Sequence, residues 1–216
     1  MNMKTNMDYL ANFLENLPKS YQKLFEEEKK YLQKIITLDA KVLDVGCGSG
    51  RSIFDILSKT KNIVGIDHSD RAVAEAKNNF SKYSSIKILK ADATQLPFDN
   101  GEFDFVICVF TFANFADKKF VILEDMKRVL KESGKIIISA FSEDATEERM
   151  KAYKSLGVKI KEVKDGTVVF DFDDNLGDNT SEQFTKEQLE DIFSQANLKI
   201  ENMTKVNIAY LCTLIK

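Results

Sequence analysis

The first forty positions of the chain alternate apolar and polar residues with the period of an α-helix. Apolar residues recur at helical spacing over residues 7–17, and Pro18 ends that pattern. A second apolar stripe runs over residues 21–36, while its charged residues face the opposite side. We therefore expect two cap helices within residues 1–40.

From residue 41 the pattern changes to short apolar runs that alternate with amphipathic segments. Strands are predicted at residues 42–45, 62–66, 86–89, 103–110 and 135–141, and helices at 49–59, 69–80 and 117–130. Ser69 is placed to cap the second of these helices. Apolar, β-branched strands that alternate with helices are typical of a parallel sheet covered on both faces. The pattern thus predicts an α/β core over residues 41–141.

After residue 141 the alternation stops. The elements predicted there are a helix at 145–156, strands at 158–163 and 167–172, a helix from Lys186, and final strands near 198–203 and 206–215. Asp165-Gly166, between the first two of these strands, is typical of a two-residue β-hairpin turn. We interpret residues 142–184 as an insertion that helps to form a substrate lid. Residues 185–216 then close the sheet.

Composition and charge narrow the function. The 216 residues are 44% hydrophobic and 30% charged, which is typical of a globular protein with one domain and an elaboration. The net charge of −3 disfavours DNA binding, because duplex binders carry a basic excess. A single histidine, His68, excludes metal sites that need two imidazoles. Three widely spaced cysteines form neither a disulfide framework nor a zinc site, so no metal is expected.

The distribution of apolar runs also bears on location. The amino terminus has no apolar run after its lysine, so we expect no secretory signal. The longest apolar stretch, residues 105–113, is about half as long as a membrane-spanning helix. These features predict a cytoplasmic protein without membrane insertion, and they leave monomer and homodimer open.

A glycine-rich loop, G-C-G-S-G at residues 46–50, follows the first predicted core strand and leads into a helix. Glycines let a backbone turn sharply and approach a ligand closely. The helix start adds free N–H groups and the positive end of the helix dipole. Asp67, at the end of the next strand, is placed to accept hydrogen bonds from two ribose hydroxyls. Strand, loop, helix and acidic residue together predict a nucleoside cofactor.

Further motifs follow this loop in a fixed order. The set is V-L-D-V-G-C-G-S-G at 42–50, V-G-I-D at 64–67, A-D-A at 91–93, L-P-F at 96–98, F-D-F-V-I-C-V at 103–109 and R-V-L-K-E-S-G-K-I-I-I-S at 128–139. The set resembles the class I S-adenosylmethionine-dependent methyltransferases, and its L-P-F and R-V-L-K elements resemble the type 11-like branch that methylates small molecules. The resemblance implies a Rossmann-like three-layer α/β/α sandwich, whose mainly parallel seven-stranded sheet has an antiparallel last strand.

The same resemblance implies the cofactor and its contacts. S-adenosyl-L-methionine would supply a methyl group to an O, N or C atom of a small molecule by in-line displacement, leaving S-adenosyl-L-homocysteine. Asp44 would orient the glycine loop beneath the methionine part, Asp67 would bind the ribose, and Asp92 would accept from the adenine amino group. The implied contacts are Asp44, Gly46, Cys47, Gly48, Gly50, Asp67, His68, Asp92, Ala93 and Val109.

The sequence identifies the residues that contact the methyl acceptor less clearly than those that bind the cofactor. No catalytic acid or base is assigned, and the weak candidates for substrate contact are Asn114, Tyr21, Arg149 and Tyr153. For Arg149 and Tyr153 a solvated helix face is the favoured interpretation. Helix packing explains the tyrosines of the cap helices (Tyr9, Tyr21 and Tyr31) at least as well as a ligand contact does. Three phenylalanines could line a pocket, with at least one of them in the core: Phe110, Phe112 and Phe115.

Two charged features are interpreted as surface groups. Arg51, at the start of the first core helix, is either a contact for a carboxylate or a surface charge, and we favour the surface charge. Asp171, Asp173 and Asn175, with Glu182, have the spacing of calcium ligands. Leu176 replaces the glycine that a calcium loop needs, so we favour an exposed acidic turn.

The sequence leaves two other classes of function open. One is a non-catalytic module that binds S-adenosylmethionine. The other is a nucleotide-dependent oxidoreductase, which is disfavoured because nicotinamide and flavin sites prefer G-x-G-x-x-G to the spacing found here. A protein or RNA acceptor also stays open, although the acidic balance gives no support to RNA.

Overall fold

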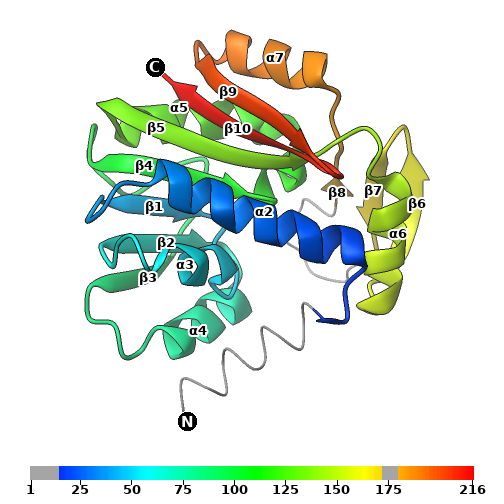
Figure 1. Ribbon diagram of the computed structural model, residues 1–216, viewed down its shortest axis with the longest axis horizontal. Helices are drawn as coiled ribbons and strands as arrows, with labels where there is room; N and C mark the ends of the chain where they lie inside the picture. The colour runs from blue at the N-terminus through cyan, green and yellow to red at the C-terminus, as the bar shows by residue number, and fades with distance from the viewer. Residues whose placement is uncertain (1–14, 172–179) are drawn as a thin grey trace.

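A seven-stranded, mainly parallel β-sheet lies at the centre of the protein (Figure 1). The computed structural model describes residues 15–171 and 180–216. The strands are β1 (Val42–Val45), β2 (Ile63–Asp67), β3 (Ile86–Lys90), β4 (Phe103–Val109), β5 (Leu130–Phe141), β9 (Lys199–Val206) and β10 (Ala209–Ile215). They lie in the order β3-β2-β1-β4-β5-β10-β9. The strand order reverses between β1 and β4, which is where open α/β sheets bind ligands.

Helices cover both faces of this sheet. On one face lie α2 (Lys19–Ile35), α3 (Arg51–Ile56) and α4 (Asp70–Asn79), and on the other lie α5 (Lys119–Val129) and α7 (Lys186–Gln195) (Figure 1). Each face has its own apolar core, because the central strands are buried on both sides. Ser69 caps α4 as expected, and its hydroxyl accepts a hydrogen bond from the Ala72 N–H. The predicted three-layer α/β/α fold is confirmed.

The last strand departs from the parallel arrangement. β10 runs antiparallel to both of its neighbours, β5 and β9, and lies between them. Its residues are almost wholly buried, whereas β9 at the sheet edge alternates exposed and partly exposed residues. The predicted antiparallel last strand is therefore confirmed.

β5 begins five residues earlier than the strand predicted at 135–141. Phe103 of β4 pairs with Leu130, but Phe105 already pairs with Lys135, so the chain bulges between the two pairs. Gly134 makes this bulge feasible: a Cβ there would lie 2.8 Å from the Asp104 carbonyl oxygen. The sequence prediction missed the early pairing because its polar residues do not alternate as in a half-buried strand.

The segment that interrupts the core forms a small separate sheet. It contains α6 (Thr146–Ser155) and the antiparallel strands β6 (Ile160–Lys164), β7 (Thr167–Phe170) and β8 (Thr180–Ser181). The β6–β7 turn is the predicted two-residue hairpin, since Asp165 and Gly166 both adopt positive φ, at 48° and 77°. The Glu182 N–H donates to the Ala113 carbonyl at 2.8 Å, which attaches this segment to the loop after β4.

Of the two predicted cap helices, the structure describes only the second in full. The second is α2, which lies across the face of the sheet and is buried along one side, as its apolar stripe predicts. Almost all of the first, expected at residues 7–17, lies outside the described residues. Among the residues that the structure describes, no helix is long and apolar enough to cross a membrane.

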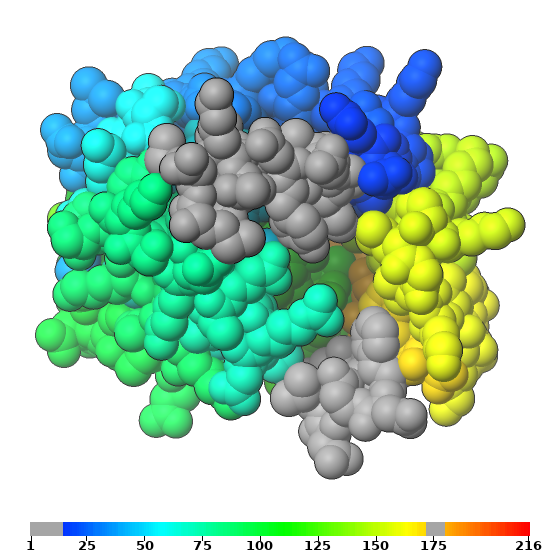
Figure 2. Space-filling view, turned by 90° about the horizontal axis from the view of Figure 1, so that it is seen from below, coloured from blue at the N-terminus to red at the C-terminus, as the bar shows by residue number. Residues whose placement is uncertain are grey.

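Figure 2 shows the molecule from below the view of Figure 1. The yellow atoms of α6, β6 and β7 stand at one side, and the cyan-green atoms of α4 and β3 stand at the other. Between them the green atoms of the central chain are recessed. In Figure 1 the parallel strands run toward the side on which α6 and the small sheet lie, so the loops that follow them lie at that side.

Candidate functional site

The glycine loop turns sharply between β1 and α3 and is shaped by three glycines with positive φ. Gly46, Gly48 and Gly50 have φ values of 72°, 55° and 95°. A Cβ at Gly46 would lie 2.3 Å from the Thr111 Cγ2, and one at Gly50 would lie 2.2 Å from a carbon of the Phe80 ring. A Cβ at Gly48 would meet nothing within 4 Å. Two of the glycines thus permit packing inside the protein, while Gly48 faces open space.

Asp67 joins the end of β2 to this loop. Its Oδ2 accepts from the Gly48 N–H and its Oδ1 accepts from the Ser69 N–H, both at 2.9 Å. The side chain remains 11% exposed, so both oxygens keep lone pairs for further donors. His68 is 64% exposed next to it, with its Nδ1 3.7 Å from the Asp67 carboxylate. The loop and the predicted ribose contact are therefore held together before any ligand binds.

Asp44 lies fully buried beneath the loop. Its Oδ2 accepts from the Ser52 hydroxyl at the start of α3, whereas its Oδ1 is buried without a hydrogen-bond partner. Burial raises the pKa of Asp44 to about 7, although the Ser52 hydroxyl and the Arg51 charge act in the opposite direction. The unpartnered Oδ1 of Asp44 is therefore available to accept a hydrogen bond from a donor on a ligand.

The other predicted cofactor contacts lie around the same strand ends. Asp92 is exposed after β3, and hydrogen bonds from the Thr94 N–H and hydroxyl lower its pKa. Ala93 is partly buried beside it. Cys47 and Val109 are buried at the loop and at the end of β4. Burial raises the pKa of the Cys47 thiol, so this group stays protonated and is no nucleophile.

A cavity of about 270 Å³ opens beside the loop. It lies against the turn of the glycine loop, the start of α3, the end of β4 and the side of α2. The lining residues are Phe25, Gly46, Cys47, Gly48, Ser49, Arg51, Ser52, Glu75, Val109 and Phe110. The predicted cofactor residues Gly46, Cys47, Gly48 and Val109 thus meet in one cavity. Two aromatic rings, from α2 and from the end of β4, form its far wall.

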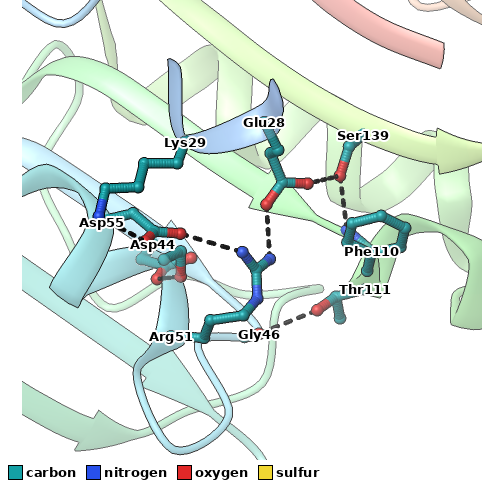
Figure 3. Close-up of polar contacts among 10 residues, drawn as sticks. Glu28, Lys29, Asp44, Gly46, Arg51, Asp55, Phe110, Thr111 and Ser139 are labelled. Carbon is teal, nitrogen blue, oxygen red and sulfur yellow. Dashed lines mark hydrogen bonds and ion pairs between the residues drawn. The ribbon is translucent and has the colours of Figure 1, made fainter. Parts of the chain in front are cut away.

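Arg51 is no surface charge, so the favoured interpretation of the sequence was wrong. Its side chain is only 16% exposed and lies between two carboxylates (Figure 3). Nη2 donates to Glu28 at 2.5 Å, and Nη1 donates to Asp55 at 3.1 Å. The guanidinium also lies 4.3 Å from the centre of the Phe25 ring. Arg51 therefore connects the cap helix α2 to the first helix of the core.

These carboxylates decide the protonation of the cluster. Burial alone would lower the pKa of Arg51, but the charges of Glu28 and Asp55 outweigh it and raise that pKa. Burial raises the pKa of Asp55 to about 6, against the opposing effect of Arg51. The arginine thus stays charged throughout the physiological range beside the cavity.

Glu28 is the functional residue that the sequence reasoning missed. Its second oxygen accepts from the Ser139 hydroxyl at 2.7 Å, and that hydroxyl in turn accepts from the Phe110 N–H at 3.0 Å (Figure 3). One signal was available: Glu28 stands on the apolar stripe of α2, four residues from both Leu24 and Leu32. A carboxylate at that spacing indicates a buried acid with a partner.

The chain after β4 turns into the cavity because Phe110 has a left-handed backbone. Its φ is 65°, which is uncommon for a bulky residue. The Phe110 N–H is held by both the carbonyl and the hydroxyl of Ser139, and Thr111 donates to the Gly46 carbonyl at 2.9 Å. These contacts fix the Phe110 ring against the glycine loop, where it lines the cavity.

The other aromatic candidates lie elsewhere. Phe112 and Phe115 are buried in the apolar core, which confirms that not all three phenylalanines line a pocket. Asn114 is exposed in the short helix η1 (Thr111–Asn114). Tyr31 packs α2 onto the closing strands, where its hydroxyl contacts Thr213 at 2.7 Å. Tyr9 lies outside the described residues.

Tyr21, Arg149 and Tyr153 come together where α2 meets α6. Arg149 has no exposed surface, and Tyr153 is only partly exposed, so a solvated helix face is wrong for both. The Arg149 guanidinium donates to the carbonyls of Gly166 and Ser181, at 2.7 and 2.6 Å. It therefore holds α6 to the small sheet, and it lies 4.9 Å from the centre of the Phe141 ring.

The structure describes only some of the residues with calcium-ligand spacing. Asp171 and Glu182 are described, whereas Asp173 and Asn175 lie outside the described residues. Glu182 forms an ion pair with Lys119. No group of three or more metal-ligating side chains is found in the described part of the chain.

Comparison with known proteins shows what these features are similar to. Residues 42–134 match the family model described as a methyltransferase domain. The demethylmenaquinone methyltransferase of Staphylococcus aureus is 29% identical over 147 residues, covering 62% of this chain. The chain spans 61% of the length of that relative. The family-model match runs from β1 and the glycine loop through the start of β5.

Solved structures extend the likeness to the whole fold. A protein from Pyrococcus horikoshii is 25% identical, with a TM-score of 0.71 over 92% of both chains. A 1,6-didemethyltoxoflavin-N1-methyltransferase from Burkholderia thailandensis, solved with its substrate and S-adenosylhomocysteine, is 16% identical. Its TM-score is 0.67 over 89% of this chain and 77% of its own. The predicted resemblance to the class I S-adenosylmethionine-dependent methyltransferases is confirmed.

Proposed function

From the methyltransferase domain at residues 42–134 and the class I fold around it, we propose that the protein transfers a methyl group from S-adenosylmethionine to a small molecule. The observation that carries the proposal is the glycine loop itself. Gly48 faces open space beside a cavity while its N–H is bonded to Asp67, so backbone and ribose contact are arranged around one ligand position.

The residues around the cavity fit this cofactor. Gly48 leaves room for a ligand, since a Cβ there would project into open space. The free Oδ1 of Asp44 and the exposed Asp92 carboxylate supply acceptors at two ends of the site, with Asp67 between them in the order of the strands. We propose that Asp67 binds the ribose hydroxyls, Asp92 the adenine amino group, and Asp44 the amino group of the methionine part.

Arg51 supplies the complementary charge. It remains positively charged between Glu28 and Asp55 and lines the cavity. We propose that it attracts the carboxylate of the methionine part, which revives the interpretation that the sequence disfavoured. The buried Glu28 keeps the guanidinium in position, because charge-assisted hydrogen bonds fix the planar fork.

Methyl transfer from this cofactor requires little acid–base chemistry from the residues of the chain. When bound, S-adenosylmethionine supplies a methyl group on a positively charged sulfur, which is already an electrophile. We propose that Phe25 and Phe110, which line the cavity, hold an acceptor against the loop. Alignment, rather than a strong base, is therefore the main contribution of this chain.

For the acceptor we propose a small molecule of aromatic character. The cavity wall is aromatic, and the Staphylococcus aureus relative carries demethylmenaquinone in its name. The protein's three cysteines are free and buried, which supports the further proposal that it works in the reducing cytoplasm. The net charge of −3 supports neither DNA nor RNA as acceptor.

Isothermal titration calorimetry with S-adenosylhomocysteine tests the cofactor. We expect saturable binding to the wild-type protein, and binding about 2 kcal/mol weaker for Asp67→Ala, because hydrogen bonds to a charged group are lost. Asp70→Ala is the matched control, since that nearby carboxylate is 83% exposed and pairs with Lys90. A thermal melt of each variant separates loss of the ligand contact from loosening of the loop.

The outcomes discriminate between the classes of function. If S-adenosylhomocysteine does not bind, the proposal fails. Unchanged affinity in Asp67→Ala would remove the ribose contact but leave the cofactor. A screen for transfer of labelled methyl groups to a pool of small aromatic metabolites then distinguishes an enzyme from a non-catalytic binding module.

A further inference from the structure

Buried polar atoms without partners are concentrated in one place. Among the described residues, five buried side-chain polar atoms have no hydrogen-bond partner. One is the Asp44 oxygen at the glycine loop, and the other four lie where the insertion meets the core: Tyr21 Oη, Ser142 Oγ, Arg149 Nε and Thr180 Oγ1. Folded proteins satisfy almost all such groups, so a cluster of exceptions requires an explanation. We call these four residues the polar junction.

Two groups of the polar junction, Tyr21 and Arg149, lie against the Phe141 ring. The Tyr21 ring centre lies 5.9 Å from that of Phe141, and the Arg149 guanidinium lies 4.9 Å from it. The Arg149 charge and the Tyr153 phenol both act on the Tyr21 hydroxyl, which places these groups close together. Ser142 follows Phe141 in the chain, and Thr180 precedes Ser181, whose carbonyl binds Arg149.

Packed aromatic rings connect the polar junction to the cavity at the glycine loop. Phe141 lies 5.0 Å from Phe110, and Phe110 lies 5.3 Å from Phe25, measured between ring centres. Phe25 and Phe110 line the cavity. A row of aromatic rings therefore leads from the loop to Tyr21 and Arg149.

The hydrogen-bonding character of the unpartnered atoms indicates which ligand could satisfy them. Arg149 Nε can only donate, and burial raises the pKa of Tyr21, so its hydroxyl stays protonated and able to donate. Two buried donors above an aromatic wall suit an oxygen atom carried by a flat, apolar body. A wholly apolar ligand would leave both donors unsatisfied.

We propose that the polar junction is the acceptor's recognition subsite, and that the acceptor is a planar aromatic molecule whose oxygen substituent accepts hydrogen bonds from Tyr21 and Arg149. The proposal rests on the proposed function and adds the class of its substrate. Tyr21 and Arg149 determine specificity here and take no part in the methyl transfer itself.

Tyr21→Phe is the sharpest test, because it removes one hydroxyl that has no partner in the protein. We expect it to melt at the same temperature as the wild type or higher, since an unsatisfied buried hydroxyl contributes nothing to folding. With the protein saturated in S-adenosylhomocysteine, we use 2-naphthoate as the probe in calorimetry. Its binding should weaken about tenfold in Tyr21→Phe, while the affinity for S-adenosylhomocysteine stays unchanged.

Tyr31→Phe is the matched control on the same helix. The Tyr31 hydroxyl is bonded to both Thr213 and Asn202, so its loss should lower the melting temperature and leave 2-naphthoate binding unchanged. Ser142→Ala provides a second variant at the polar junction, because it also removes an unpartnered hydroxyl. It should keep the wild-type stability.

The results separate this inference from the proposed function. A protein that binds S-adenosylhomocysteine but not 2-naphthoate overturns the inference and leaves the function standing. So does wild-type affinity for 2-naphthoate in Tyr21→Phe, or a clear drop in its melting temperature. Failure to bind S-adenosylhomocysteine would instead refute the function on which the inference rests.

Discussion

The glycine loop and the polar junction lie on the same side of the molecule, yet they differ in how far their buried polar groups are hydrogen-bonded. At the loop nearly every group is bonded within the protein: Gly48 to Asp67, Arg51 to Glu28, and Thr111 to Gly46. At the junction four buried atoms lack partners. The loop is thus rigid before its ligand arrives, whereas the junction is completed by a ligand.

This difference agrees with what each region has to recognise. A cofactor that many proteins use can be bound by a preorganised site, whose geometry is fixed by hydrogen bonds within the chain. An acceptor must be distinguished from similar molecules, and buried donors reject any ligand that lacks the matching oxygen. Stability should therefore depend strongly on the polar contacts of the loop and weakly on those of the junction.

The largest effect is expected at Glu28, which links the cap helix to the loop. Glu28→Ala should lower the free energy of unfolding by about 4 kcal/mol, because it leaves the buried Arg51 short of a partner. Urea denaturation measures this loss. Glu26→Ala on the same helix is the control, since that carboxylate is 65% exposed and its removal should change little. Equal losses of unfolding free energy in Glu28→Ala and Glu26→Ala would show that the Glu28–Arg51 ion pair stabilises the fold no more than an exposed pair does.

The buried Asp44 should give the loop a characteristic pH dependence. An aspartate in an unfolded chain loses its proton near pH 4, whereas burial raises the pKa of Asp44 to about 7. Between these values the folded state binds more protons, so its stability falls as pH rises, by at most about 1.4 kcal/mol per unit. Asp44→Asn should remove the part of this slope that Asp44 contributes, about 3 kcal/mol across the window, and leave the part from Asp55, whose pKa burial raises to about 6.

Asp104→Asn is the control for that titration. Burial acts to raise the pKa of Asp104, but Lys131 and the Lys41 N–H outweigh it and lower that pKa. Its stabilising effect is present above the unfolded pKa and lost as pH falls below about 4. Denaturation curves from pH 4 to 7 should therefore differ for Asp44→Asn alone. A parallel response of both variants would contradict the assignment.

The glycine loop should also show steric strain that a surface glycine does not. Gly46→Ala and Gly157→Ala both place a side chain at positive φ, at 72° and 67°. Only the first meets the protein, because its Cβ would lie 2.3 Å from Thr111 while that of Gly157 meets nothing within 4 Å. Gly46→Ala should thus be destabilised by about 2 kcal/mol more than Gly157→Ala in thermal denaturation. Equal losses would show that the backbone conformation alone sets the cost.

The smallest effect concerns helix caps on the two sides of the molecule. Thr185 starts α7 with a full capping box, in which the Gln188 side chain also accepts from the Thr185 N–H at 2.8 Å. Ser69 starts α4 with one bond of 3.4 Å. Thr185→Ala should therefore cost about 1 kcal/mol, and Ser69→Ala less. Thermal melts of both variants rank the two caps, and the reverse order would contradict this reading of the geometry.

Local sequence signals were sufficient for the core. The alternation of strands and helices gave the order of the elements, because parallel strands buried on both faces have continuous apolar runs, such as 105–109. The hairpin at Asp165-Gly166 followed from turn chemistry alone. The bulge at the start of β5 could not be predicted, since it depends on the contact of Gly134 with β4.

Long-range contacts limited the reading of the candidate site. The glycine loop and Asp67 carry their chemistry within one strand–loop–helix–strand unit, so their neighbourhood could be predicted. Arg51 was misjudged because its partner Glu28 lies 23 residues away on another helix. Arg149 was misjudged for the same reason: its carbonyl partners lie in the β6–β7 turn and in β8, which come together only in the folded insertion.

The hydrogen bonds of Tyr31 have a consequence for the order of folding. They join α2 to Thr213 and Asn202, at sequence separations of 182 and 171 residues. During synthesis the ribosome therefore releases the closing strands long after α2, and α2 can complete these bonds only then. Because α2 also carries Phe25 and Glu28, we expect the cavity wall to be fully fixed only after the closing strands have paired. Ligand affinity in nascent chains would thus report that the closing strands have paired.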